Sequence, residues 1–394
     1  MRRGGGEGQA AAIDKELDHL WDRALGKLSG YAPTLGDRLY DWVDKEHVEW
    51  TDGWGWTDGF WVGLLWLIYE STQDPLWADL ARRSKHRFKE RLAVHETHDH
   101  DMGFLYTLSS VAEYTITRDP EAREMAMAAA RSLAARFNPF GQFLRAWNDW
   151  PDDTPEYRLE KRGKAIVDSM MNLPLLWWAW RETGIAMFSD IAHAHAKTTI
   201  KYFLREDGST CHTFNFDPVT AQPLEPRTHQ GLADDSCWAR GHAWALYGFA
   251  LAYTATGKAE YLEASRTCAR FWSRHTPESG IPPWDFDAPG QPTSDTSAAA
   301  IGACGLLELA RHVGEEEAGE CQKLAVRSLS HLGTDFWQPQ PYMGLITGGV
   351  SHMPRKQGVG VSLIYGDYFF LEGLLRAQGR THFYWCAPRT NERC

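Results

Sequence analysis

The sequence lacks most of the features that reveal function at first sight. No apolar run is long enough to cross a membrane, and the first residues contain no apolar core of a secretory signal. The seven cysteines are scattered without a CxxC pair, which favours reduced thiols in the cytoplasm over a disulfide framework. There is also no Gly-rich phosphate loop, no HExxH helix, no Ser-His-Asp triad and no reactive-cysteine motif. Neither membrane insertion nor a phosphate-binding loop is therefore expected.

Positive charge is also in short supply. The chain has 41 Lys and Arg against 52 Asp and Glu, a net charge of −11, which argues against a nucleic-acid partner. Aromatic residues, in contrast, make up 13% of the 394 residues and include 19 Trp. Flat aromatic rings line buried faces and also serve as platforms for sugar rings. A carbohydrate ligand fits this composition, and we expect a monomer or weak homo-oligomer.

Two kinds of helical segment alternate along the chain. Six are apolar nearly all round, as in residues 59–71, and six are amphipathic and charged, as in residues 78–93. A helix that is apolar all round is buried, whereas one with a polar face lies outside. Six inner helices paired with six outer helices close into an all-α (α/α)6 barrel. No linker divides the chain, so we predict a single domain over residues 11–394 after a flexible tail of residues 1–10.

An aspartate precedes each of the six apolar segments, at spacings of 43, 67, 67, 60 and 72 residues. Asp is a preferred N-cap residue, which is the simplest explanation for any one of them. If the inner helices run parallel, their N-termini meet at one end of the barrel, where helix dipoles attract anions. Aspartates that face inward there become acid/base candidates. The six are Asp58, Asp101, Asp168, Asp235, Asp295 and Asp367.

The densest charged stretch is HETHDHD, residues 95–101, which raises the possibility of a metal site. A catalytic metal needs three protein ligands and an open position, and no convincing third ligand accompanies His98 and His100. His193 and His195 are two residues apart, which on a helix points them to different faces, and we place them on an outer, solvated helix. No metal is therefore expected.

Asp168 lies between apolar residues in the segment KAIVDSMMNL. Burial raises the pKa of a carboxyl group by desolvation, and a raised pKa suits a proton donor near neutral pH. An N-cap to the next helix is the structural alternative, and the two roles are compatible. Elsewhere, polar residues stand beside aromatics in loops, as in a sugar subsite. These candidates are Trp54, Trp56, Arg145, Trp147, His212, His229, Gln230, Trp238, Arg240, His242 and Trp244.

Several long segments resemble, in the same order, those of the unsaturated glucuronyl hydrolases, bacterial enzymes that act on oligosaccharides released by polysaccharide lyases. The resemblance spans roughly residues 38–385. It implies an (α/α)6 barrel and a glycoside hydrolase that needs no cofactor. The matching segments are WTDGFWVGLLWL, HDMGFLYTLS, VDSMMNLPLLWWA, HTFNFDP, THQGLADDSCWARGHAWALYGFA and YGDYFFLEGLLR.

The resemblance also implies a role for each matching residue. Asp168 would be the general acid/base, and Asp101 a second carboxyl group that contacts the unsaturated sugar and helps to set the protonation of the site. His242 departs from the family pattern, in which Gln is usual. The implied substrate-binding residues are Trp56, His100, Trp147, His212, His229, Gln230, Trp238, Arg240, Trp244, Ser351 and Lys356. The rest of the HETHDHD stretch is expected in a solvated loop: His95, Glu96 and His98.

The implied reaction removes a 4,5-unsaturated uronic acid from the nonreducing end by hydrating its vinyl ether. Three alternatives stay open: an unsaturated rhamnogalacturonyl hydrolase, another (α/α)6 glycosidase, and a non-catalytic sugar-binding protein. The resemblance implies that family members active on sulfated disaccharides use an Arg in the THQG segment, where this chain has His229. They also use Ser and Lys in a C-terminal loop that resembles GGVSHMPRKQG, residues 348–358, where Pro354 falls near the position of a second Ser. Ser351 and Lys356 could fill part of the sulfate-binding role. We therefore expect better turnover of unsulfated than of sulfated substrates.

Overall fold

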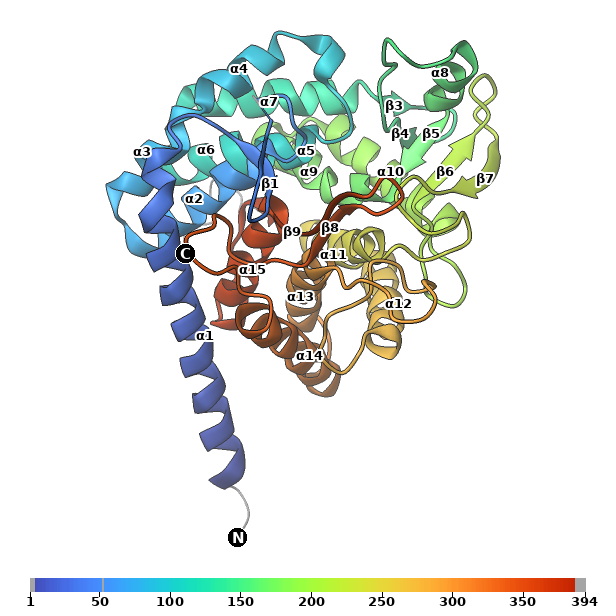
Figure 1. Ribbon diagram of the computed structural model, residues 1–394. Coiled ribbons are helices and arrows are strands. Elements are labelled where there is room, and N and C mark those ends of the chain that lie inside the picture. Colours follow the sequence, from blue (N-terminus) through green and yellow to red (C-terminus); the bar gives the residue numbers. More distant parts are fainter. Residues whose placement is uncertain (1–3, 52, 387–394) are drawn as a thin grey trace.

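Six buried helices form a ring at the centre of the molecule, and other helices surround them (Figure 1). The structure is a computed structural model that describes residues 4–51 and 53–386, with only the backbone for residues 4–14. The inner helices are α2 (Asp58–Thr72), α5 (Met102–Tyr106) continued through a π-helical turn (Thr107–Val111) into α6 (Ala112–Thr117), α9 (Leu173–Thr183), α11 (Ala239–Thr256), α13 (Thr296–Ala310) and α15 (Ile364–Ala377). The outer helices are α1 (Gly4–Tyr31), α3 (Pro75–Arg83) with α4 (Lys85–Leu92), α7 (Pro120–Ala134), α10 (Ala186–Tyr202), α12 (Ala259–His275) and α14 (Glu315–Thr334).

Burial separates the two layers as the hydrophobic pattern predicts. Every residue of α13 is buried, whereas its outer neighbour α14 buries one face and begins with three exposed or half-exposed Glu residues. Each inner helix contacts the next one around the ring, and α15 contacts α2, so the ring is closed. Close approach of the inner helices needs small residues: a Cβ on Gly103 would lie 2.3 Å from Cα of Asn172. The predicted all-α barrel is therefore the observed architecture.

Short strands cover the end of the barrel at which the inner helices begin. They form three small sheets, ordered β2-β1-β9-β8, β3-β4 and β5-β6-β7. Their bounds are β1 (Tyr40–Val43), β2 (Val48–Trp50), β3 (Phe137–Asn138), β4 (Phe143–Leu144), β5 (Lys164–Ile166), β6 (Thr213–Phe216), β7 (Pro223–Arg227), β8 (Gly349–His352) and β9 (Gln357–Leu363). The remaining elements are α8 (Pro155–Arg162) and short 3₁₀ turns at Ala32–Thr34, His95–Thr97, Val167–Met171 and Tyr384–Cys386. The sequence analysis predicted none of these strands, because most are too short to show an alternating pattern.

The predicted N-terminal tail differs from the structure. Helix α1 begins at Gly4, inside that tail, and its first turns project beyond the other helices (Figure 1). The Ala-rich stretch before Asp14 extends the helix, because Ala has the highest helix propensity. Residues 1–3 lie outside the described part. None of the described helices is long and apolar enough to cross a membrane.

Five of the six aspartates lie where the inner helices begin, as predicted: Asp58, Asp101, Asp168, Asp295 and Asp367. Only Asp295 among these five is recorded as a side-chain cap, with its carboxylate accepting the Ser297 N–H at 3.0 Å. Asp235 also precedes its inner helix, α11, but it is exposed in the loop and the buried Trp238 takes the N-cap position, so the capping interpretation fails for Asp235. The capping interpretation therefore explains one of these residues and leaves others facing inward.

Candidate active site

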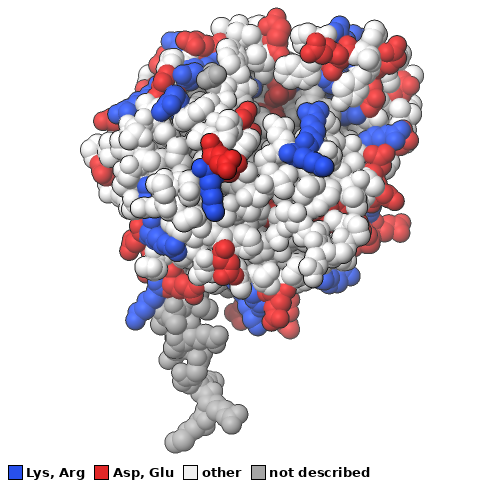
Figure 2. Space-filling model, in the orientation of Figure 1, with Lys and Arg blue, Asp and Glu red and all other residues white. Residues whose placement is uncertain are grey.

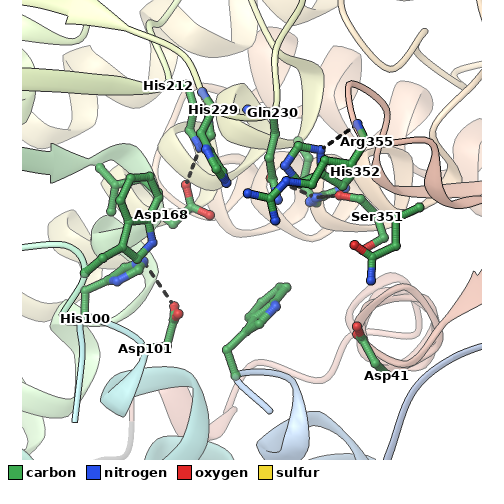
Figure 3. Close-up of a pocket in the computed structure, with 15 residues that line it drawn as sticks. Asp41, His100, Asp101, Asp168, His212, His229, Gln230, Ser351, His352 and Arg355 are labelled. Carbon is green, nitrogen blue, oxygen red and sulfur yellow. Dashed lines mark hydrogen bonds and ion pairs between the residues drawn. The ribbon is translucent and has the colours of Figure 1, made fainter. Parts of the chain in front are cut away.

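A pocket opens at this end of the barrel, with a volume of about 300 Å³ accessible to water (Figure 3). It collects residues from segments spread over almost the whole chain, because the loops before five of the six inner helices reach the same place. The lining residues are Asp41, Trp56, His100, Asp101, Trp147, Ile166, Asp168, His212, His229, Gln230, Arg240, Ser351, His352, Arg355 and Gln357.

Asp101 and His100 share one wall of the pocket. The Nδ1 atom of His100 lies 2.9 Å from the carbonyl oxygen of Ala146, so Nδ1 carries the proton and Nε2 presents a lone pair. That Nε2 faces Oδ1 of Asp101 at 3.4 Å. Burial, and then the nearby Asp99 carboxylate, raise the pKa of Asp101 well above its usual range. Nε2 of His100 and a carboxylate oxygen of Asp101 are both hydrogen-bond acceptors, so their close approach is favourable when Asp101 is protonated and donates its O–H towards Nε2.

Asp168 lies beside this wall and faces His212. Burial raises its pKa to about 7; His100 and Arg240 oppose this rise, and Asp101 adds to it. The Nδ1 atom of His212 accepts the backbone N–H groups of His229, at 3.0 Å, and Gln230, at 3.2 Å. Its proton is therefore on Nε2, which points at Oδ2 of Asp168 from 3.9 Å. Oδ2 of Asp168 and Nε2 of His212 have no hydrogen-bond partner in the described residues, so both are available to a ligand.

Arg240 lines the pocket and also holds neighbouring residues in place behind it. Its buried guanidinium pairs with Asp295 at 3.2 Å, donates to the Ser351 carbonyl at 2.8 Å and donates to Oε1 of Gln230 at 3.1 Å. Holding Oε1 in this way leaves the amide N–H groups of Gln230 to face the pocket. The same guanidinium lies 4.5 Å from the ring centre of Trp238.

Ten of the 13 predicted site residues line the pocket, and three do not: Trp238, Trp244 and Lys356. Trp238 is buried behind His212, with ring centres 4.4 Å apart. Trp244 faces the barrel core and packs on Phe104. Lys356 is exposed in the β8–β9 turn. On α11, residues one turn apart take different environments, which the segment pattern alone did not distinguish.

Five lining residues were missed by the sequence analysis: Asp41, Ile166, His352, Arg355 and Gln357. The segment GGVSHMPRKQG was recognised, but its turn directs Arg355 rather than Lys356 into the pocket. Asp41 comes from β1, whose pairing with β9 places it opposite Asp168 (Figure 3). Burial raises the pKa of Asp41 to about 6. No local pattern marks these residues, because strand pairing between distant segments brings them to the site.

Three histidine predictions also need correction or completion. His98 is buried rather than solvated, and its Nε2 lies 2.9 Å from the Arg91 carbonyl oxygen. His195 is buried under the β3–β4 hairpin, where its Nδ1 accepts the Leu144 N–H at 3.0 Å. His242 lies outside the pocket, between Thr210 and the Cys268 carbonyl. A hydrogen-bonded role in the protein interior explains all three.

One cluster of acidic and imidazole groups in the described chain has a metal-like arrangement. The ligand atoms of Asp99, His100 and Asp101 lie within 4.8 Å of one another. Asp99 already accepts the backbone N–H of Asp101 at 2.9 Å through Oδ1. The cluster supplies three ligands, which the sequence analysis had not found, so the expectation of a metal-free site stays a prediction for experiment.

Comparison with known proteins identifies the family. A sequence profile described as Glycosyl Hydrolase Family 88 matches residues 37–308. An unsaturated glucuronyl hydrolase of Bacillus sp. (strain GL1) is 37% identical over 381 residues, covering 93% of this chain and 99% of that protein. An unsaturated chondroitin disaccharide hydrolase of Streptococcus pneumoniae is 36% identical over 90% of this chain and 87% of that protein.

Solved structures agree with this assignment. The crystal structure of the Bacillus sp. GL1 unsaturated glucuronyl hydrolase, which degrades glycosaminoglycan, has a TM-score of 0.87 at 36% identity, covering 94% of this chain and 100% of that chain. A structure of an unsaturated glucuronyl hydrolase variant with dGlcA-Glc-Rha-Glc matches with the same TM-score of 0.87, identity and coverage. With the buried carboxyl pair and the barrel in place, the chain belongs to Glycosyl Hydrolase Family 88 and is a glycoside hydrolase of the unsaturated glucuronyl hydrolase type.

Proposed function

We propose that Asp168 and Asp101 carry the removal of the 4,5-unsaturated uronic acid from the nonreducing end of lyase-generated oligosaccharides. The observation that carries this assignment is the pair of buried carboxyl groups that meet in one pocket, both with raised pKa values. A carboxyl group with a pKa of about 7 holds a proton at neutral pH and can also release it, as acid/base catalysis requires.

Asp168 acts on the double bond rather than on the anomeric carbon. As acid it donates a proton to C4, and positive charge develops on C5 and the ring oxygen. As base, the resulting carboxylate takes a proton from the water that attacks C5. The hemiketal at C5 then opens, and the glycosidic bond breaks with release of the aglycone. One residue serves both steps, unlike the two-carboxylate displacement at C1.

Neighbouring groups support this cycle. A protonated Asp101 donates a hydrogen bond without adding negative charge beside an anionic uronate. The Nε2–H of His212 and the amide N–H groups of Gln230 are donors for the uronate carboxylate or hydroxyls. Trp147, whose ring centre lies 5.1 Å from that of His229, offers a face on which the next sugar stacks.

The same pocket bears on sulfate. His229 stands at the position where the resemblance implies an Arg in sulfate-active relatives. Burial, with His352 and Arg355 nearby, lowers the pKa of His229 to about 4. A neutral imidazole lacks the permanent charge and bidentate fork of a guanidinium. This supports a preference for unsulfated substrates, although Arg355, which also lines the pocket, supplies a cation.

Isotope labelling tests the mechanism. The reaction is run in ¹⁸O water, and the released uronate is fragmented in the mass spectrometer to locate the label. Label on the C5 oxygen is expected. Label on the C1 oxygen would show ordinary glycoside hydrolysis, and no turnover of any unsaturated disaccharide would favour a sugar-binding protein. Asp168→Asn should lower kcat by about 10²–10⁴-fold, while the exposed Asp235→Asn should not.

A cytoplasmic location and a monomeric or weakly associating state are also proposed. Six described cysteines are all free, which supports a reducing compartment. Sedimentation of the purified protein at micromolar concentration tests the oligomeric state, and fractionation of the native cells tests the location.

A further inference from the structure

A second hollow adjoins the pocket and has a volume of about 590 Å³ accessible to water. The two share Trp56, Asp101, Trp147, His229 and Arg355, so they are continuous. Figure 2 shows a hollow in the upper half of the displayed face, with basic side chains on its margin. We call the second hollow the outer groove. Its other lining residues are Trp54, Gly55, Arg91, Thr97, Asp99, Trp150, Asp153, Tyr157 and Lys161.

Trp150 is exposed in the outer groove but is held in place. Trp150 has a relative solvent exposure of 52%. The backbone N–H of Trp150 donates to Oδ2 of Asp153 at 2.6 Å, and the backbone N–H of Asp153 donates back to the Trp150 carbonyl at 3.1 Å. The buried Lys161 ammonium binds Asp153 at 2.5 Å and the Asn148 carbonyl at 3.1 Å. An indole on a loop fixed in this way is a preformed apolar platform.

Trp54 lines the same groove from the loop before α2. It is 49% exposed, and its backbone N–H donates to the Thr51 carbonyl at 3.1 Å. Two large indoles left open beside the pocket keep apolar area in water, which a ligand ring would cover. Because the groove is continuous with the pocket, the ligand that fits it is the part of the substrate that extends away from the reacting sugar.

Three cations line the outer groove, and two of them are already paired within the protein. Arg91 donates to the Gly55 carbonyl at 2.8 Å and the Thr97 carbonyl at 3.3 Å, and Lys161 is paired with Asp153. Arg91 and Lys161 are therefore engaged within the protein, whereas Arg355 lies where the groove meets the pocket. Asp99, half-buried in the same wall, adds negative charge. A polyanionic segment would find little compensation here, whereas sugar rings, including a ring with a single carboxylate, need mainly stacking faces and hydrogen bonds.

We infer that the outer groove is an additional substrate subsite, in which Trp150 and Trp54 stack on sugars beyond the first two of the oligosaccharide. This inference rests on the proposed function, because the reacting uronate must occupy the inner pocket. It makes Trp150 a determinant of chain-length preference: oligosaccharides of three or more sugars gain a contact that disaccharides do not reach.

Kinetics with unsulfated chondroitin products of two lengths test this inference. We expect kcat/KM to be higher for the unsaturated tetrasaccharide than for the disaccharide, and Trp150→Ala to lower the tetrasaccharide-to-disaccharide ratio by about three- to tenfold. Trp150→Phe should retain part of the ratio. Phe140→Ala is the matched control, because Phe140 is 87% exposed and lies outside the residues that line the groove; it should leave the ratio unchanged.

Two outcomes would overturn the inference: a wild-type ratio of one or less, or a ratio that Trp150→Ala does not change. Calorimetric binding of both oligosaccharides to Asp168→Asn gives a second reading if Trp150→Ala does not fold, with tighter tetrasaccharide binding expected and equal affinities contradicting the subsite. Activity on the disaccharide with no length preference removes only the outer subsite. Inactivity towards every unsaturated oligosaccharide removes the proposed function itself.

Discussion

Replacing Asp168 by Asn should stabilise the protein at alkaline pH while lowering its kcat by about 10²–10⁴-fold. The folded-state pKa of Asp168 is about 7, against about 3.9 for an unfolded Asp. The folded state therefore binds this proton more tightly than the unfolded state does. The stabilising contribution of the proton is complete below about pH 4 and is lost as the pH rises through about 7. Above that pH, the wild-type fold must hold a buried carboxylate.

The size of the effect follows from the pKa difference. About three pKa units at about 1.4 kcal/mol each set an upper limit of about 4 kcal/mol at pH 8. The carboxyl is partly open to the pocket, with 13% side-chain exposure, so relaxation and water entry reduce this value. We expect Asp168→Asn to be more stable by about 2 kcal/mol at pH 8, which corresponds to about 2 °C in Tm for a protein of this length. Near pH 4 both proteins carry a neutral group, and the difference should vanish.

Differential scanning calorimetry of both proteins between pH 4 and 8 measures this difference. Asp235→Asn is the matched control, because Asp235 is exposed in a loop and should show no comparable trend. An Asp168→Asn gain that is the same at pH 4.5 and pH 8, or a loss of stability at pH 8, would refute the claim that burial of this carboxyl group strains the fold. Such active-site strain is a common exchange of stability for function.

Four further predictions test other parts of the site and fold. The rate of the first step should fall as the pH rises through about 7, because Asp168 then loses the proton that it donates; a kcat/KM profile rising steadily to pH 9 would contradict this. His229→Arg should narrow the preference for an unsulfated over a 6-sulfated chondroitin disaccharide by about tenfold, the worth of one charge-assisted hydrogen bond; a wild-type preference for the sulfated form would refute it and implicate Arg355. Dialysis against EDTA should leave kcat unchanged, whereas loss of activity restored by zinc or manganese would assign a metal to Asp99, His100 and Asp101. Gly103→Ala should lower the free energy of unfolding by about 2 kcal/mol or more, because the new Cβ would lie 2.3 Å from Asn172. Gly319→Ala in α14 is the control: no atom lies within 4 Å of its Cβ position, so a thermal melt should show a neutral or slightly stabilising effect.

The architecture was predictable because the same local patterns of apolar and charged residues recur along the chain. Helices buried on every side read as apolar throughout, and helices with one wet face read as amphipathic, so the two barrel layers could be assigned from composition along the chain. Asp168 could be chosen because apolar residues surround it in the sequence, whereas Asp101 was one of six aspartates at the start of an apolar segment. The resemblance to a known family singled out Asp101 and supplied the individual roles of both residues.

Only the tertiary structure decided which side chains reach the pocket. Trp244 and Arg240 are one turn apart on α11, yet one packs into the core and the other borders the pocket. Asp41 reaches the site because β1 pairs with β9 across more than 300 residues of chain, and Arg355 because a tight turn directs it inward. Local patterns report how deeply a segment is buried; the direction of a side chain within the barrel depends on strand pairing and helix rotation, which arise from contacts between distant segments.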